Sequence, residues 1–202
     1  MKKFSRDKGE YSKPFFHFDL DGTLADTFEL NLQAYKFAVE SVGGNWNQNA
    51  TKTLLSGAQA SNFLQDCTNV PQQRFPEVQS IKREYFLRNL QMIKPISEGM
   101  ELLSSAGELA GLVTNSSKVN AIAVLKCLKI QDKFSHIITG TDVKNHKPHP
   151  EPYLLSISMA EKKYLTKLTH IAVEDSEMGK TSAFQAGLRI ISLGKPCKIE
   201  NC

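Results

Sequence analysis

The sequence contains few of the residues that build disulfide frameworks, zinc sites or membrane spans. Among its 202 residues are four cysteines, scattered without Cys-x-x-Cys pairs or histidines at zinc-ligand spacing. We therefore expect reduced thiols and a cytoplasmic protein. Charge or glycine interrupts every apolar run within a few residues, which argues against a membrane span. Polar residues follow Met1–Lys3, so no secretory signal peptide is expected.

The sequence also lacks a clustered basic segment. The net charge is +4, but the lysines are spread along the chain without interleaved aromatics. A nucleic-acid-binding face would show a basic patch or stripe, so we expect no nucleic-acid partner. With 41% hydrophobic and 23% charged residues, the chain has the composition of an ordinary globular protein. Its length fits one large domain, or one domain that carries a small insert.

Short apolar runs alternate with segments of helical spacing. The helical segments include Val119–Lys126, after a Ser116–Ser117 cap, and Pro150–Met159, with proline near its first turn. Strands that alternate with helices predict an α/β fold, in which a Rossmann-like, doubly wound parallel sheet forms the core. The expected strands are Phe15–Phe18, Ala110–Val113, His136–Ile138, His170–Val173 and Arg189–Leu193.

One interval breaks this alternation, because its pattern is helical from about Thr27 to Met92. A first helix is expected up to the Gly43–Gly44 stop, a second over Ala58–Cys67 and a third over Pro76–Leu90. Helices inserted after the first strand predict an α-helical cap domain. The expected division is a core of residues 1–26 and 93–202 and a cap of residues 27–92.

Two acidic clusters follow two of the predicted strands. Asp19-Leu20-Asp21-Gly22-Thr23 follows the first strand, and Glu174–Asp175 ends the fourth. Ligands bind at the carboxyl ends of strands in open α/β sheets. An isolated Asp-x-Asp-Gly is also common in turns and helix caps. If both clusters face one crevice, however, the like charges need a cation, and oxygen ligands without histidine or cysteine favour Mg²⁺.

Two further elements suit an anionic ligand. Thr114-Asn115-Ser116-Ser117 runs from a strand into a helix start, where hydroxyls and free backbone N–H groups can hold a phosphate. The alternative, which is compatible, is that Ser116 or Ser117 caps the helix. Lys147 lies in a loop stiffened by Pro148 and Pro150, although a lone loop lysine is usually a solvated charge.

Taken together, these motifs closely resemble the four motifs of the haloacid dehalogenase-like hydrolases. They are Asp19–Thr23, Thr114–Asn115, Lys147–Pro148 and Glu174–Asp175, and they occur in the family's order at the expected strand ends. The resemblance extends from about Pro14 to Leu193. The helical insert resembles the small cap of the phosphoglycolate phosphatase and β-phosphoglucomutase-like branch.

The resemblance implies a phosphatase that cleaves small phosphate monoesters through a phospho-aspartyl intermediate. Asp19 would be the nucleophile and Asp21 the general acid and base. Mg²⁺ would be held by the Asp19 carboxylate, the Asp21 backbone carbonyl and Asp175, with Glu174 as an auxiliary or water-mediated ligand. Phosphate contacts would come from Gly22, Thr114, Asn115 and Lys147.

The insert is expected to set substrate specificity. Leu55–Ala58 resembles the glycine-containing loop that this branch projects over its site, so Ser56 and Gly57 are candidate substrate contacts; the alternative is a simple turn. The insert lacks an obvious arginine for a substrate carboxylate, which argues against phosphoglycolate itself. The expected partner is a small phosphorylated metabolite such as a sugar phosphate or a nucleotide, and the expected state is a monomer or weak homo-oligomer.

Other activities of the superfamily differ in what they require. The second aspartate, Asp21, favours phosphoryl transfer over dehalogenation. Phosphonate cleavage would need a Schiff-base lysine in the cap, and Lys52, Lys82 and Lys94 have no motif around them. A phosphomutase of the β-phosphoglucomutase type shares every core motif and is the main alternative. A non-catalytic module comes third, because such chains usually lose a motif residue and this one keeps them.

Overall fold

The computed structural model describes residues 12–55, 64–65 and 68–194. Its core is a five-stranded parallel sheet in the order β5-β4-β1-β6-β7. This arrangement confirms the predicted α/β fold with a doubly wound sheet. The strands are β1 (Lys13–Phe18), β4 (Ala110–Val113), β5 (Ile137–Ile138), β6 (Leu168–Glu174) and β7 (Arg189–Ser192).

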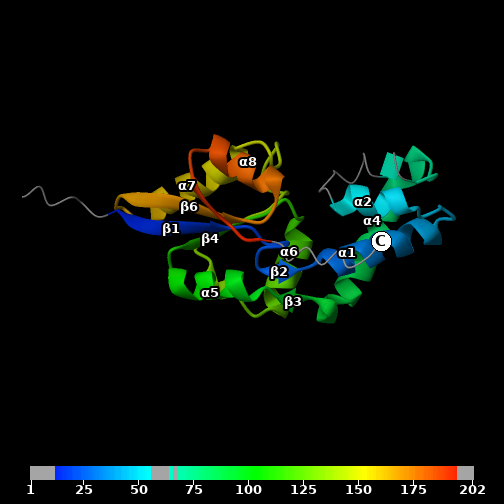
Figure 1. Cartoon of the computed structure of the whole chain (residues 1–202), viewed down its shortest axis with the longest axis horizontal. Coiled ribbons are helices and arrows are strands. Elements are labelled where there is room, and N and C mark those ends of the chain that lie inside the picture. The colour runs from blue at the N-terminus through cyan, green and yellow to red at the C-terminus, as the bar shows by residue number, and fades with distance from the viewer. Residues whose placement is uncertain (1–11, 56–63, 66–67, 195–202) are drawn as a thin grey trace, which may run out of the picture.

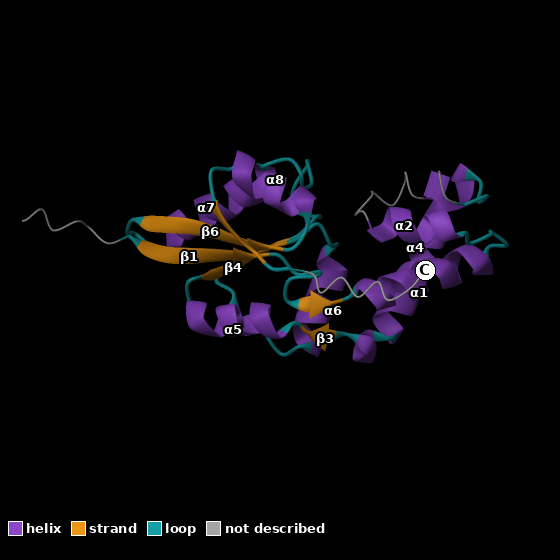
Figure 2. Cartoon of the chain, in the orientation of Figure 1, coloured by secondary structure: helices purple, strands orange, loops and turns teal. Residues whose placement is uncertain are grey.

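Helices cover both faces of this sheet, with α5 and α6 on one side and α7 and α8 on the other (Figures 1 and 2). Side chains alternate along each strand. Leu112 therefore packs into the main apolar cluster with α5 and α6, while Val113 packs with Tyr153 and Ala183 from α7 and α8. The helices are α5 (Ser97–Ala106), α6 (Lys118–Cys127), α7 (Glu151–Lys163) and α8 (Glu177–Gln185).

The insert forms a separate helical unit beyond one end of the sheet (Figure 1). It contains α1 (Phe28–Ser41), α2 (Gln48–Leu55) and α4 (Phe75–Arg88). Its helices bury an apolar cluster of their own, which includes Val39, Leu64 and Val78. A short antiparallel ribbon of β2 (Ala25–Asp26) and β3 (Lys94–Pro95) joins the two chain crossings between core and insert. Short 3₁₀ turns lie at Gln72–Arg74, Leu90–Met92 and Gln131–Lys133.

The elements follow the sequence pattern closely in the core and less closely in the insert. β4 spans the residues expected for it, and Ser117 caps α6 by accepting a hydrogen bond from the Asn120 N–H. Helix α2 lies within the interval expected to be helical, although no separate helix was expected there, and α5 was not expected. The helix expected over Ala58–Cys67 lies largely outside the described residues. No helix in the described ranges is long and apolar enough to span a membrane.

Candidate active site

The acidic clusters meet at one end of the sheet because β1 lies between β4 and β6. The parallel register pairs Phe18 with Leu112 on one side and with Val173 on the other. Asp19 continues this pairing, since its N–H donates to the Val173 carbonyl at 3.0 Å. The residues that follow all three strands therefore lie at one edge, as expected for a ligand site in a parallel sheet.

Lys147 lies at the centre of this edge. Its ammonium donates to Asp19 Oδ1 at 2.8 Å, to Glu174 Oε1 at 2.6 Å and to the Val113 carbonyl at 2.7 Å. Its loop is fixed by Asn115, whose side chain accepts from the Lys147 N–H at 2.9 Å and donates to the Lys147 carbonyl at 3.1 Å. Only 4% of Lys147 is exposed. This lysine is a buried ion-pair partner of two motif carboxylates, and not a solvated loop charge.

Asp21 is held by hydroxyl groups from two directions. Thr27 Oγ1, just before α1, donates to Oδ1 at 2.6 Å, and Ser116 Oγ, just before α6, donates to Oδ2 at 2.6 Å. Thr114 Oγ1 lies 3.5 Å from the same Oδ2. The carboxylate of Asp21 thus links the start of the insert to the core. Ser116 belongs to the segment expected to hold a phosphate or to cap a helix, but the bonds of Ser116 and Thr27 to Asp21 were not expected.

Three carboxyl groups converge as a possible metal site. One oxygen each from Asp19, Glu174 and Asp175 lies within 4.8 Å of the others. Glycine permits this approach, because a Cβ at Gly22 would lie 2.3 Å from Asp175 Oδ2 and a Cβ at Gly179 would lie 2.0 Å from the Glu174 carboxyl group. Gly22 also has a φ of +85°, which disfavours a side chain.

The balance of charge in the site favours binding of an additional cation. Burial raises the pKa of Asp19 well above its ordinary value; Lys147 opposes this, while Glu174, Asp21 and Asp175 add to it. Burial also lowers the pKa of Lys147, but Asp19 and Glu174 outweigh it, so its pKa is raised and the ammonium stays charged. One ammonium faces four carboxyl groups, and a cation bound by these oxygens would let them ionise together.

A lysine of the insert also acts on this site. Lys82, in α4, is 9% exposed and donates to Asn31 Oδ1 at 2.7 Å. The side chain of Asn31 donates in turn to the Thr27 carbonyl at 3.1 Å. Burial lowers the pKa of Lys82 to about 8, and the charge of Asp21 opposes the lowering. A polar path therefore runs from Lys82 through Asn31 and Thr27 to Asp21. No local motif marks Lys82, because its partners come from another helix.

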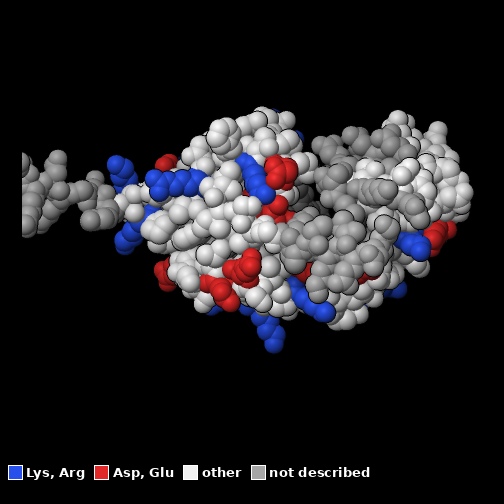
Figure 3. Space-filling view, viewed as in Figure 1, with Lys and Arg blue, Asp and Glu red and all other residues white. Residues whose placement is uncertain are grey.

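The candidate cap contacts Ser56 and Gly57 lie outside the described residues. Acidic atoms are visible at the end of the core that lies nearest the insert (Figure 3). The histidines lie away from the carboxylates of the four motifs. His17 pairs instead with Ser156 and His170, and His146 contacts the Gly140 carbonyl.

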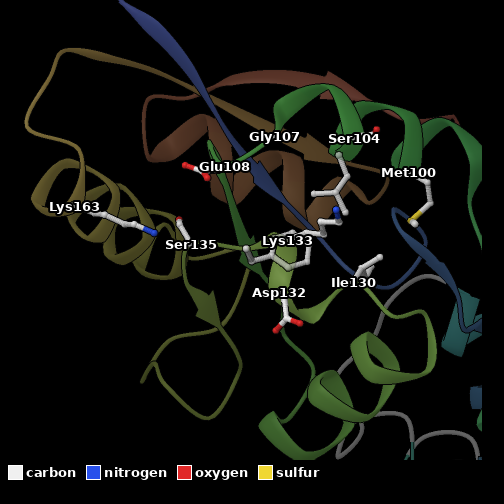
Figure 4. Close-up of a pocket in the computed structure, with 11 residues that line it drawn as sticks. Met100, Ser104, Gly107, Glu108, Ile130, Asp132, Lys133, Ser135 and Lys163 are labelled. Atoms are coloured by element: carbon white, nitrogen blue, oxygen red, sulfur yellow. The ribbon is translucent and has the colours of Figure 1, made fainter.

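A cavity of about 690 Å³ lies away from these motifs (Figure 4). Residues before β4 and β5, including Glu108 and Ser135, line it together with Lys163 at the end of α7. These positions mark the amino ends of the strands, which is the opposite edge of the sheet. None of the residues that line this cavity belongs to the four motifs, so it is not the candidate active site.

Comparison with known proteins places this geometry in a family. Residues 17–193 match the family model for haloacid dehalogenase-like hydrolases, and the chain belongs to that family. It is 27% identical over 179 residues to a phosphorylated carbohydrates phosphatase of Thermotoga maritima, covering 86% of this chain and 82% of that protein. It is 25% identical over 189 residues to the β-phosphoglucomutase of Bacillus subtilis, covering 88% and 82%.

A solved structure shows the same fold. The crystal structure of CbbY from Rhodobacter sphaeroides in complex with phosphate matches with a TM-score of 0.74 and 23% identity. The match covers 93% of this chain and 88% of that one. The family resemblance predicted from the four motifs is thus confirmed, and so is the Rossmann-like core with a helical insert.

Proposed function

We propose that this chain is a Mg²⁺-dependent phosphatase that hydrolyses small phosphate monoesters through a phospho-aspartyl intermediate on Asp19. The observation that carries this proposal is the contact of Lys147 with both Asp19 and Glu174, which joins three of the four motifs at one strand edge. Relatives named as phosphatases and phosphomutases support chemistry on phosphate esters.

The donor set of the site fits a magnesium ion. The candidate ligands are the Asp19 carboxylate, the Asp21 backbone carbonyl and Asp175, with Glu174 as an auxiliary ligand. All are oxygen donors, and Mg²⁺ is commonly held by one or two carboxylates together with water and substrate phosphate. When bound, the ion would supply positive charge that keeps the carboxylates ionised and neutralises the phosphate.

The protein's own groups would carry the two steps. A carboxylate oxygen of Asp19 attacks phosphorus, and the bond from phosphorus to the leaving oxygen breaks as Asp21 gives that oxygen a proton. Asp21 then takes a proton from the water that attacks the aspartyl phosphate, which releases phosphate and restores Asp19. Lys147, the Thr114 hydroxyl and backbone N–H groups near Gly22 and Asn115 would bind the non-bridging oxygens.

The insert would select the substrate. We propose the same two domains as above, with residues 1–26 and 93–202 as the catalytic core and residues 27–92 as the cap. Lys82 brings a buried positive charge toward Asp21, which suits a substrate with polar or anionic groups beyond its reacting phosphate. Ser56 and Gly57 remain candidate contacts. A phosphorylated carbohydrate, the substrate class named for the Thermotoga relative, is the first class to test.

Phosphate release tests this proposal. Purified protein is assayed with p-nitrophenyl phosphate and a panel of sugar phosphates, nucleotides and phosphoglycolate, with Mg²⁺ or with EDTA. We expect metal-dependent release that Asp19→Asn abolishes. Isomerisation of a hexose phosphate without net phosphate release would instead favour the mutase. Absence of both reactions in the Mg²⁺-loaded wild type would contradict a catalytic role.

A further inference from the structure

Tyr153 makes a contact with the site that none of the four motifs accounts for. It lies in the first turns of α7 and is fully buried. Its hydroxyl donates to Glu174 Oε1 at 2.6 Å. The Lys147 ammonium donates to the same oxygen at 2.6 Å and also lies 4.9 Å from the centroid of the Tyr153 ring. Tyr153 therefore contacts both members of the buried ion pair.

Packing alone does not explain a tyrosine at this position. The ring packs with Val113, Ile138 and Ala183, among which a phenylalanine would fill the same volume. A buried hydroxyl is costly unless it has a hydrogen-bond partner, so its presence points to the bond with Glu174. Burial raises the pKa of the Tyr153 hydroxyl well above its ordinary value, and Glu174 adds to this, so the group stays protonated and acts as a donor.

The bond fixes the orientation of the Glu174 carboxylate. Oε1 accepts from both Tyr153 and Lys147, while Oε2 accepts from Ser176 Oγ at 3.3 Å. These donors fix the direction in which the carboxylate faces, and one of its oxygens lies within 4.8 Å of an oxygen each of Asp19 and Asp175. Gly179 provides the room that this orientation needs. The same contact keeps Glu174 beside Lys147, which shares its ammonium with Asp19.

We propose that Tyr153 is a positioning residue, which orients Glu174 toward the cation site and thereby holds Lys147 against Asp19. The expected change in kcat rests on the proposed function, whereas the expected change in cation affinity does not. Groups that hydrogen-bond to a metal-binding carboxylate typically contribute about 10- to 100-fold to metal affinity or activity.

The test compares Tyr153→Phe with wild type by calorimetric titration with Mn²⁺ in the absence of substrate. We expect Mn²⁺ affinity to fall about tenfold and kcat to fall by a similar factor, with a smaller change in KM. Tyr164→Phe is the matched control, because Tyr164 ends the same helix and donates to the Glu108 carbonyl, far from the carboxylates. It should leave Mn²⁺ affinity unchanged.

A double-mutant cycle shows whether Tyr153 acts through Glu174. In a Glu174→Gln background, Tyr153→Phe should change Mn²⁺ affinity less than twofold, since its partner is already altered (about 0.4 kcal/mol or less). An equal loss in both backgrounds, or unchanged affinity in Tyr153→Phe, would overturn the inference, as would a wild type that binds no Mn²⁺. If the wild type binds Mn²⁺ but releases no phosphate, the proposed phosphatase activity is refuted, but the proposed role of Tyr153 in cation binding is not.

Discussion

At the scale of single residues, Gly22 shows how backbone geometry and the acidic site depend on each other. A side chain there would meet two separate obstacles: a positive φ and the Asp175 carboxyl group 2.3 Å from the Cβ position. The first obstacle affects stability, and the second affects the position of a candidate metal ligand. The two effects can be separated, because Gly187 has a similar φ of +81° with nothing within 4 Å of a Cβ.

We therefore predict that Gly22→Ala weakens both stability and cation binding, whereas Gly187→Ala weakens stability alone. The positive φ should cost each variant about 1 kcal/mol in the free energy of unfolding. Gly22→Ala should in addition lower Mn²⁺ affinity and phosphate release at least about tenfold, because Asp175 must move. Chemical denaturation and Mn²⁺ titration measure the two quantities. Equal Mn²⁺ affinities in the two variants would contradict this view of Gly22.

Lys82 presents the opposite case, in which a residue weakens the fold and serves the site. Burial lowers its pKa from 10.5 to about 8, which corresponds to a cost of about 3 kcal/mol at neutral pH. The cost is full below pH 8. Between pH 8 and 10.5 the unfolded chain keeps the proton that the folded chain has lost, so stability rises with pH and the cost disappears.

We predict that Lys82→Met stabilises the protein by about 2 kcal/mol at pH 7, after allowance for the hydrogen bond lost to Asn31. The gain should shrink as the pH rises from 8 and become a loss of about 1 kcal/mol near pH 10.5, where only the lost hydrogen bond remains. At pH 7, kcat/KM should fall at least about tenfold. Urea denaturation at several pH values and steady-state kinetics measure these effects. Lys36→Met, on an exposed position of α1, is the control that should change neither. A Lys82→Met variant with full activity would exclude Lys82 from the site.

At the scale of elements, the start of α6 combines a structural cap with a group that positions the acid. Ser117 caps the helix through the Asn120 N–H at 3.4 Å, while its neighbour Ser116 donates to Asp21 at 2.6 Å. Two adjacent serines therefore have different roles, and their alanine variants should differ accordingly.

We predict that Ser116→Ala lowers kcat about tenfold with little loss of stability, because Asp21 loses one of its hydroxyl donors. Ser117→Ala should lower the free energy of unfolding by about 0.5–1 kcal/mol and leave kcat unchanged. Thermal unfolding and phosphate release measured on both variants decide this. The reverse pattern would show that the two roles are assigned to the wrong serines.

Most core elements could be predicted from the sequence, whereas several contacts of the site could not. Apolar runs predicted the core strands, but the sequence alone left open whether the two acidic clusters face one crevice, which the strand order β5-β4-β1-β6-β7 decides. The contacts of Ser116, Tyr153 and Lys82 could not be predicted, since each partner is far away in sequence. Helix α2 lies inside the interval expected to be helical but was not separated from its neighbours, and α5 was not expected.

At the scale of the whole molecule, the insert joins the core at the acidic edge and also packs against it, since Leu30, Ala34 and Phe86 of the insert lie in the main apolar cluster. The insert buries its own cluster, and the chain crosses between the units at the β2–β3 ribbon. Asp21 and Thr27 lie on either side of one of these crossings, and the path from Lys82 to Asp21 spans it. This arrangement would let the insert influence Asp21, the proposed acid, while the carboxyl edge of the sheet holds Asp19, the proposed nucleophile.

We propose that Asp19 carries the phosphoryl group between the two steps, and acid-quench trapping tests this most directly. The wild type is mixed with radiolabelled substrate and Mg²⁺ for less than one turnover, quenched in acid and separated from free phosphate. We expect protein-bound, hydroxylamine-sensitive label that maps to Asp19 and is absent from Asp19→Asn. Rapid phosphate release with no labelled protein at any time point, or label on another residue, would contradict it.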